Sequence, residues 1–205
     1  MSVRGRSHRL TINYRTTQEI LTWAVRLLAN EKPDGLDDEA DTLVGYRSTM
    51  HGRRPTIQSN PDREAEHERL AAQIRTRIGD GVEPSSIGVA ARHVWAAKSV
   101  REALDAAQIP ASTTNATKSN AVRVGTVHAM KGLEFRCVAV VGVEDGVVPA
   151  KGAVTTLAED PIAHDHDHQR ERCLAFVAGT RARDSLYLSY VGTPSPFLQD
   201  SGKTG

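Results

Sequence analysis

The sequence predicts an α/β fold, a doubly wound and mostly parallel sheet with helices on both faces. Short apolar runs alternate along the chain with amphipathic stretches of helical spacing, a pattern typical of such sheets. The run CVAVVGV at 137–143 is continuously apolar, as expected for a strand covered on both faces. The chain has 205 residues, of which 39% are hydrophobic and 25% charged, which suffices to bury a core.

Helices and strands alternate through the first half of the chain. The first helix has apolar residues at helical spacing and is preceded by Thr16 and Thr17, which can cap its N-terminus. A polar loop over 30–42 follows it. The predicted elements are a helix over 18–29, a strand within 51–61, a helix over 63–78, a strand over 87–91 and a helix over 96–107.

The second half continues the alternation after a polar linker over 109–121. The predicted elements are strands over 122–127 and 137–143, a helix over 168–180 and a closing strand over 185–190. We therefore expect one domain over 1–191 and a flexible tail over 192–205.

Composition excludes several classes of protein. The formal net charge of +1 is nearly balanced, although four arginines cluster near the start, either as a solvated terminus or facing phosphate. Cys137 and Cys173 lie far apart, outside any ligand-like spacing, so we expect two buried thiols in a reducing compartment. No apolar run reaches the roughly 20 residues of a membrane span, and no signal peptide opens the chain. We expect a cytoplasmic protein that does not enter membranes.

The stretch VRVGTVHAMKGLEF at 122–135 carries an unusual set of polar side chains. A strand is followed within a few residues by His128, Lys131 and Glu134, around Gly132. Parallel sheets place ligand chemistry at the carboxyl ends of their strands, which predicts a site here. A structural loop, with the glycine in a turn and the glutamate as a cap, is the alternative.

Two other stretches place arginines at the ends of predicted elements. INYRTTQEI carries Tyr14 and Arg15 before a helix, and RERCLAFVAGTRARDSLYLS carries Arg172 within a helix and Arg181 at its end. An arginine at a helix end is often only a solvated charge that interacts with the helix dipole. Three polar clusters at loop edges of one domain favour a shared site.

In order and spacing, these three stretches resemble motifs IV, V and VI of the UvrD/Rep/PcrA-like superfamily 1 DNA helicases. The resemblance runs from about residue 10 to residue 190 and identifies the chain as similar to the family's C-terminal RecA-like motor domain. It implies a P-loop NTPase-like fold without its own P-loop. It also implies ATP and Mg²⁺ in a cleft between two such domains, held mainly by an N-terminal motor domain that is missing from this sequence.

The resemblance assigns a nucleotide role to five residues. Arg15 and Arg181 would reach the γ-phosphate from across the cleft and act catalytically. Tyr14 would stack on the adenine, and Glu134 would hydrogen-bond the ribose, with Gly132 shaping the adjoining turn.

The same resemblance assigns DNA contacts to a second group. Thr126 and His128 would line the track of single-stranded DNA, and Lys131 would lie in the turn between DNA and nucleotide. The implied partners are single-stranded or duplex DNA and the N-terminal motor domain.

The sequence departs from the family pattern at three places. Cys173 stands where a second arginine is usual, which leaves Arg172 alone, and Phe176 replaces the common tyrosine. The accessory domain that the family inserts before motif V is reduced here to a loop near 111–121.

Three further patterns imitate ligand sites. GKT at 202–204 resembles the end of a P-loop, but Phe197 stands where its first glycine belongs. Glu144 and Asp145 imitate a magnesium-binding pair, which the family places in the other motor domain. HDHDH at 164–168 imitates a metal site at the start of a helix, where acidic residues favour the dipole. We expect no metal site in this chain.

Two functions remain open from the sequence. The first is half of an ATP-dependent DNA helicase or translocase, either a fragment or a stand-alone relic, inactive by itself. The second is a non-catalytic RecA-like module that binds DNA or protein.

Overall fold

The computed structural model describes residues 12–28, 47–116 and 120–198. Its main sheet has six strands in the order β3-β8-β7-β4-β6-β5, and every pairing in it is parallel. The strands are β3 (Thr56–Asn60), β4 (Ile87–Ala91), β5 (Ala111–Thr113), β6 (Val122–Thr126), β7 (Phe135–Val141) and β8 (Ala182–Val191). The doubly wound α/β fold expected from the sequence is confirmed, and it is consistent with a RecA-like domain.

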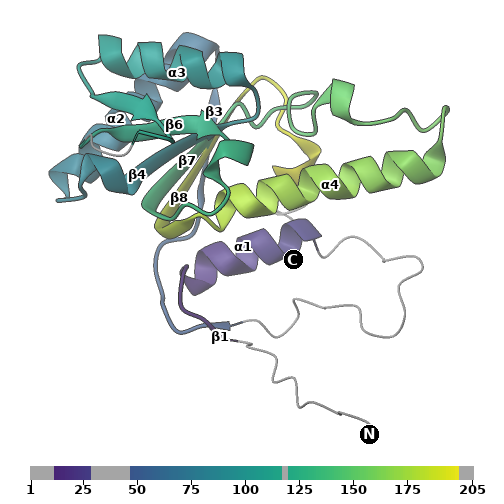
Figure 1. The fold of residues 1–205 in the computed structure, drawn as a ribbon, viewed down its shortest axis with the longest axis horizontal. Helices are drawn as coiled ribbons and strands as arrows, with labels where there is room; N and C mark the ends of the chain where they lie inside the picture. The colour runs from purple at the N-terminus through teal and green to yellow at the C-terminus, as the bar shows by residue number, and fades with distance from the viewer. Residues whose placement is uncertain (1–11, 29–46, 117–119, 199–205) are drawn as a thin grey trace, which may run out of the picture.

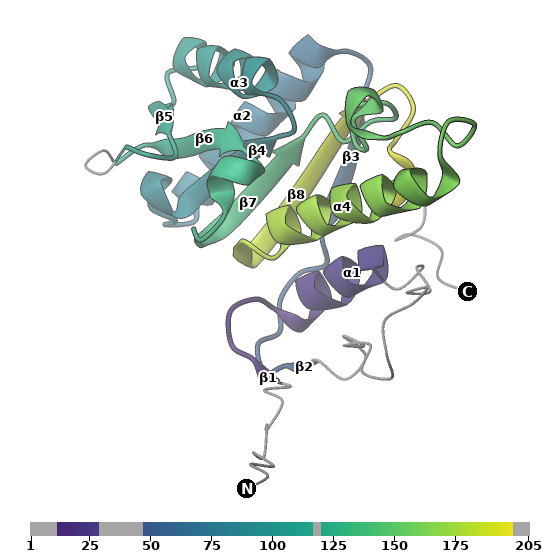
Figure 2. The ribbon, with the colours of Figure 1, turned by 45° about the vertical axis from the view of Figure 1, so that its right-hand side comes forward.

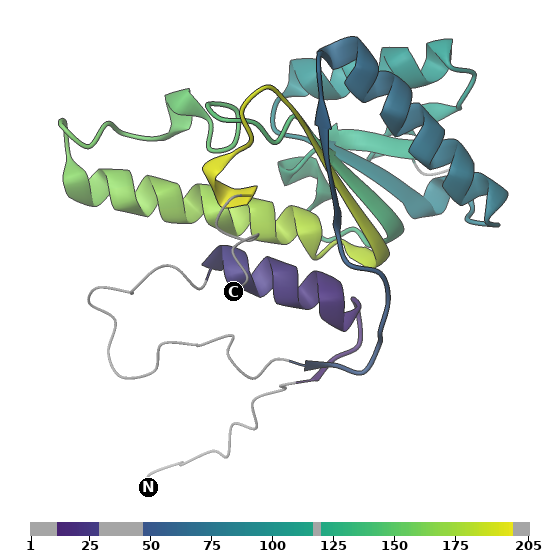
Figure 3. The same ribbon diagram turned by 180° about the vertical axis from the view of Figure 1, so that it is seen from behind.

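Helices cover both faces of this sheet (Figures 1 and 2). One apolar cluster joins α1 and α4 to the sheet, and a second joins α2 and α3 to the opposite face. The view from behind in Figure 3 shows α1 running alongside α4, away from α2 and α3. The helices are α1 (Gln18–Leu28), α2 (Arg63–Gly79), α3 (Val94–Ala106) and α4 (Pro161–Gly179).

Burial of the central strands follows from their sequence. All five residues of β4 are buried, and in β7 only Arg136 is exposed, because helices cover both faces at these strands. Small and β-branched apolar residues, which suit a covered surface, make up β4 and most of β7. The middle of the sheet is therefore the most constrained part of the fold.

The helix ends show which caps form. Asp62 accepts a hydrogen bond from the N–H of Ala65 at the start of α2, and Asp160 accepts from two first-turn N–H groups of α4. Thr16 and Thr17, expected to cap α1, are buried instead. The Thr16 hydroxyl donates to the carbonyl oxygen of Ala182, so it ties the start of α1 to β8.

The connection from β6 to β7 contains no α-helix. It spans residues 127–134 and includes a short 3-10 turn, η2 (His128–Met130). Val127 and Met130 are buried in the same cluster as α1 and α4, so the connection crosses that face of the sheet. Because β6 and β7 both run parallel to β4, it leads from the carboxyl end of one strand to the amino end of the other.

Several boundaries differ from those predicted. Part of the expected linker forms the edge strand β5, which pairs with β6. The helix expected from residue 168 begins at Pro161, because Asp160 caps it and proline suits the first helical position. A small parallel pair of strands, β1 (Ile12–Asn13) and β2 (Arg47–Ser48), lies beside α1.

The expected flexible tail is packed where the structure describes it. Phe197 and Leu198 are buried in the α1/α4 cluster, and the Ser195 hydroxyl is bonded to the carbonyl oxygen of Val148. Cys137 is buried as expected, but Cys173, also expected to be buried, is exposed on α4. None of the described helices is both long and apolar enough to cross a membrane. The loop over 30–42, the GKT at 202–204 and the first arginines lie outside the described residues.

Candidate functional site

Arg15 and Glu134, from two distant parts of the chain, form an ion pair. Arg15 precedes α1 and Glu134 precedes β7, and the Nε of Arg15 lies 2.7 Å from Oε1 of Glu134. The two side chains remain 72% and 53% exposed. The pair is therefore open to solvent and to anything that docks there.

Short-range bonds fix the backbone that carries Arg15. Its N–H donates to Oδ1 of Asn13 at 2.7 Å, a side-chain turn typical of asparagine. The next two residues attach to β8, through the hydroxyl of Thr16 and through the N–H of Thr17, which donates to the carbonyl of Arg183 at 3.1 Å. Arg15 is thus held beside the amino end of β8.

Arg181 lies at the same place, directly before β8. Its Nη1 donates to the carbonyl oxygen of Leu133 at 3.3 Å, and its Nε donates to that of Val177 at 3.2 Å. The N–H of Phe135 donates to the carbonyl of Arg181 at 3.0 Å. The arginine at the end of α4 is therefore in contact with the residues on both sides of Glu134.

These three residues share an edge of the sheet that the carboxyl-end rule does not indicate. Glu134 and Arg181 precede β7 and β8, so they lie at the amino ends of these strands, and Arg15 is bonded there. The carboxyl-end expectation is therefore wrong for Glu134, but it holds for Thr126, the last residue of β6, and for His128 just beyond it. The physical reason is the β6–β7 connection, which carries the chain from one edge to the other.

Tyr14 adds an aromatic ring near this edge. It neighbours Arg15 and is 67% exposed.

Gly132, in the connection before Glu134, has a φ of 83°, which glycine adopts readily and other residues avoid. The positive φ at this position therefore favours glycine over any residue with a side chain.

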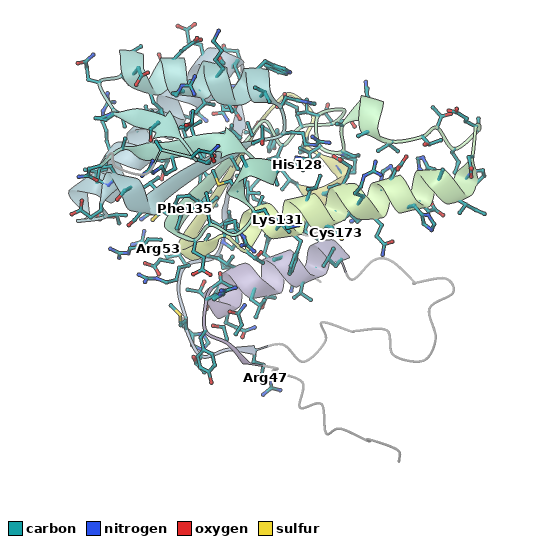
Figure 4. All side chains as sticks on the ribbon, in the orientation of Figure 1. Arg47, Arg53, His128, Lys131, Phe135 and Cys173 are labelled. Carbon is teal, nitrogen blue, oxygen red and sulfur yellow. The ribbon has the colours of Figure 1, made fainter. Side chains whose placement is uncertain are left out.

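The residues expected along a DNA track follow the β6–β7 connection. The hydroxyl of Thr126 accepts a hydrogen bond from the N–H of Ala129 at 3.2 Å, so it also caps the η2 turn. His128 and Lys131 are exposed. Figure 4 labels both on this connection, with Phe135 beyond them at the start of β7.

Acidic residues in the patterns that imitate ligand sites are bonded to other groups of the chain. Glu144 is buried and paired with Arg63, and it accepts the N–H of Val191 at 3.0 Å. Asp167 accepts from both the N–H and the hydroxyl of Thr155, at 2.9 and 2.8 Å. These bonds hold the loop before α4 against the helix.

The two terminal histidines of HDHDH share a helix face, as expected. The rings of His164 and His168 lie 4.6 Å apart between centroids. Within the described parts of the chain, no group of three or more histidine, cysteine, aspartate or glutamate side chains is placed to hold a metal ion.

The side chain of Arg172, which has no second arginine next to it in the sequence, packs against the C-terminal segment. Its guanidinium carbon lies 4.5 Å from the centroid of the Phe197 ring, and its Nη1 donates to the carbonyl of Leu27 at 3.2 Å. Arg172 therefore joins α4 to both α1 and the C-terminal segment.

Asn13 and Thr16 are positioning residues that sequence reasoning missed. The signal for Asn13 was present, because an asparagine two residues before Arg15 is the pattern of a side-chain turn. The bond from Thr16 to Ala182 joins residues far apart in the sequence, and no local pattern reveals it.

Comparisons with known proteins identify the family of the chain and agree with its fold. The model of the UvrD-like helicase C-terminal domain matches residues 8–119 and 112–193. The C-terminal domain of a possible DNA helicase from Lactobacillus plantarum WCFS1 has a similar fold. Its TM-score is 0.66, with 20% identity over 93% of this chain and 94% of that one.

Among curated proteins, the chain is 38% identical over 80 residues to the ATP-dependent DNA helicase PcrA of Staphylococcus aureus. It is 44% identical over 69 residues to the ATP-dependent DNA helicase Rep of Buchnera aphidicola. The matches cover 39% and 34% of this chain but only 10% and 9% of those proteins. Because the family model covers nearly all of the chain, this protein belongs to the UvrD-like helicase C-terminal domain family.

Proposed function

We propose that this chain is the second motor domain of an ATP-dependent DNA helicase or translocase. In this function it supplies arginines, a ribose contact and part of a single-stranded DNA track to ATP that an N-terminal motor domain holds. The observation that carries the proposal is the meeting of Arg15, Glu134 and Arg181 at one edge of the sheet.

The chemistry of phosphoryl transfer explains why arginines suit this edge. Negative charge spreads over the γ-phosphate oxygens in the transition state, and a guanidinium group supplied from a second domain neutralises it. Arginine binds two oxygens with its planar fork and stays charged at any working pH. Arg15 and Arg181 are held through backbone and side-chain bonds, which limits the reorganisation that closure would require.

The exposed groups at this edge fit a nucleotide. Tyr14 offers a ring for stacking, and the carboxylate of Glu134 can accept hydrogen bonds from ribose hydroxyls. Arg15 uses its Nε for Glu134 while most of its side chain remains exposed. Mg²⁺ would be held mainly by the N-terminal domain and would neutralise phosphate charge there.

The β6–β7 connection relates the proposed DNA contacts to the nucleotide. Thr126 and His128 lie where it leaves β6, and Glu134 lies where it enters β7. Lys131 and Gly132 occupy the stretch between them. One continuous segment thus reaches from the DNA contacts to the ribose contact, which would couple hydrolysis to movement along the strand.

The proposal is tested by replacing Arg181 in the protein that joins this domain to its N-terminal motor domain. We expect Arg181→Ala to leave ATP binding largely intact and to lower turnover by roughly 10³- to 10⁵-fold. Arg181→Lys keeps the charge but loses the fork, so it should restore little. Arg183→Ala, two residues further along the chain and within β8, is the matched control, since Arg183 is paired with Asp184.

Unchanged turnover in Arg181→Ala would refute the catalytic role and favour a non-catalytic module that binds DNA or protein. The 205-residue chain alone should hydrolyse no ATP, because it contains no P-loop sequence. Robust Mg²⁺-dependent hydrolysis by the purified chain would contradict the proposal that a separate N-terminal domain holds the ATP.

A further inference from the structure

Trp95 is a large aromatic side chain left in solvent. It lies in the first turn of α3 and is 63% exposed, and its neighbour Val94 is 76% exposed. The chain has only two tryptophans, and the other, Trp23, is buried in the α1/α4 cluster. Single exposed apolar side chains are common on protein surfaces, so a contact at this ring is inferred from what surrounds it.

The ring is held in place by its own surroundings. His93 stacks on Trp95 with 5.7 Å between ring centroids and an angle of 12° between their planes. The preceding residue, Arg92, is anchored to the buried Glu171 by two hydrogen bonds of 3.0 and 2.7 Å. A stacked, nearly parallel ring on an anchored turn is preorganised to accept another flat ring.

The register of the sheet places this turn next to the proposed DNA contacts. Ala91, the last residue of β4, pairs with Thr126, the last residue of β6. The N–H of Val127 then donates to the carbonyl of Ala91 at 3.0 Å. The segment that leads to Trp95 therefore leaves the sheet beside the segment that leads to His128, at the carboxyl edge.

Charge at this edge suits a phosphate backbone. Lys98 lies three residues beyond Trp95, on the same side of α3, with 67% of its side chain exposed. Its ion pair with Glu102 is long, at 3.7 Å, and exposed, so it holds the ammonium group weakly. An aromatic ring beside a mobile cation is the combination used to bind single strands without sequence preference.

We propose that Trp95, supported by His93, is a stacking platform for one unpaired base of single-stranded DNA. This inference rests on the proposed function, because it extends the track of Thr126 and His128 across β4 to α3. It adds an aromatic contact to a track that those two residues would otherwise form with polar groups alone. We commit to an unpaired base as the occupant, because bases inside a duplex are covered on both faces by their neighbours and leave only the two end pairs open to stacking.

The test uses the 205-residue chain at low salt, where phosphate contacts are strongest. The probes are an oligothymidylate of about 12 nucleotides, within the site sizes of single-strand binders, and a blunt duplex of equal length. We expect the oligothymidylate to quench tryptophan fluorescence saturably. The quenching should vanish in Trp95→Phe, which leaves the buried Trp23 as the only tryptophan.

Affinity is measured separately by the anisotropy of a labelled strand. Trp95→Ala should weaken binding by about 5- to 150-fold, the range measured for loss of one stacked base. Trp95→Phe should retain most of the affinity, because it keeps an aromatic face. Leu157→Ala, which removes another exposed apolar side chain, is the matched control and should change nothing.

Unchanged affinity in Trp95→Ala, or equal dependence on Trp95 for the duplex, would overturn the platform. His128→Ala separates this failure from failure of the proposed function. If His128→Ala weakens single-strand binding and Trp95→Ala does not, the proposed DNA contact of His128 is supported and the stacking role of Trp95 is refuted. If the unmutated chain binds no single strand even at low salt, both are refuted.

Discussion

The guanidinium of Arg15 and the carboxylate of Glu134 meet at 2.7 Å although each precedes a different element of the fold. The contact joins the start of α1 to the start of β7. Both side chains are largely exposed, so the pair is not a means of holding the fold together. Its position beside Arg181 favours a role in binding over a role in stability.

A double-mutant cycle tests this interpretation. Arg15→Ala, Glu134→Gln and the double variant should each change the free energy of unfolding by less than about 1 kcal/mol, with a coupling that shrinks in high salt. Urea unfolding of the 205-residue chain measures all three. A coupling of several kcal/mol would mean that the pair is structural.

Gly132 offers a test of the turn in the β6–β7 connection. An added Cβ would meet no atom within 4 Å, but the φ of 83° is strained for any L residue with a side chain. Gly132→Ala should therefore destabilise the chain by about 1 kcal/mol through backbone strain alone. Gly152→Ala, also in open space but without a positive φ, is the control and should not destabilise. Equal effects would exclude strain as the cause.

The buried carboxylate of Glu171 predicts a dependence of stability on pH. Burial by itself would raise the pKa of Glu171, but hydrogen bonds from Arg92 and from the N–H of Ala150 outweigh burial and lower it. Because the unfolded carboxyl binds protons more tightly, the stabilisation is full above about pH 4.3 and is lost as the pH falls through the lowered folded value.

Glu171→Gln should remove most of this contribution. At pH 7 we expect a loss of about 3–5 kcal/mol, because Arg92 is left without its buried partner. The loss should shrink in acid, when measured by urea unfolding across pH. Glu102→Gln, which removes an exposed partner of Lys98, should be nearly neutral at every pH. A loss that is constant with pH would contradict the assignment.

The packed C-terminal segment gives a prediction about core stability. Phe197 is 1% exposed and lies under the guanidinium of Arg172. Phe197→Ala should cost about 3–5 kcal/mol, the range for emptying a buried aromatic site. Ile162→Ala, at an exposed position of α4, should stay within about 0.5 kcal/mol. Thermal and urea unfolding would each detect the difference, and a neutral Phe197→Ala would mean that the segment is loosely attached.

The two cysteines should differ in reactivity. Burial raises the pKa of the Cys137 thiol, and the thiolate is the reactive form, whereas Cys173 is exposed on α4. In the native chain we expect one thiol to react quickly with Ellman's reagent and the second only after denaturation. Cys173→Ser should abolish the fast phase, and Cys137→Ser should leave it. A fast phase that survives Cys173→Ser would show that β7 opens readily.

The sequence was most informative where one local pattern dominated. The continuous apolar runs of β4 and β7 and the helical spacing of α2 predict their elements closely, because both depend on neighbouring residues. Linker residues 111–113 were missed as a strand, because β5 is a short edge strand with polar residues. Its pairing with β6 stabilises it more than its own composition does.

The candidate site was likewise predictable only where a local pattern revealed it. The motifs singled out Arg15, Glu134 and Arg181 individually, but their meeting depends on the order of β7 and β8 in the sheet, which no single motif contains. The edge on which Glu134 lies was predicted wrongly, because the path of the β6–β7 connection is a property of the whole sheet. Bonds such as that from Thr16 to Ala182 likewise become visible only in three dimensions.

The β6–β7 connection has almost no slack. Thr126 is level with Ala91, and Phe135 lies before the level of Ile87, so residues 127–134 must descend about 20 Å and step sideways over two strand spacings of about 4.8 Å. Part of this length is coiled into the η2 turn, which rises only about 2 Å per residue. While its turns stay folded the connection has little spare length, so a displacement at His128 would shift Glu134 unless the η2 turn unwinds first.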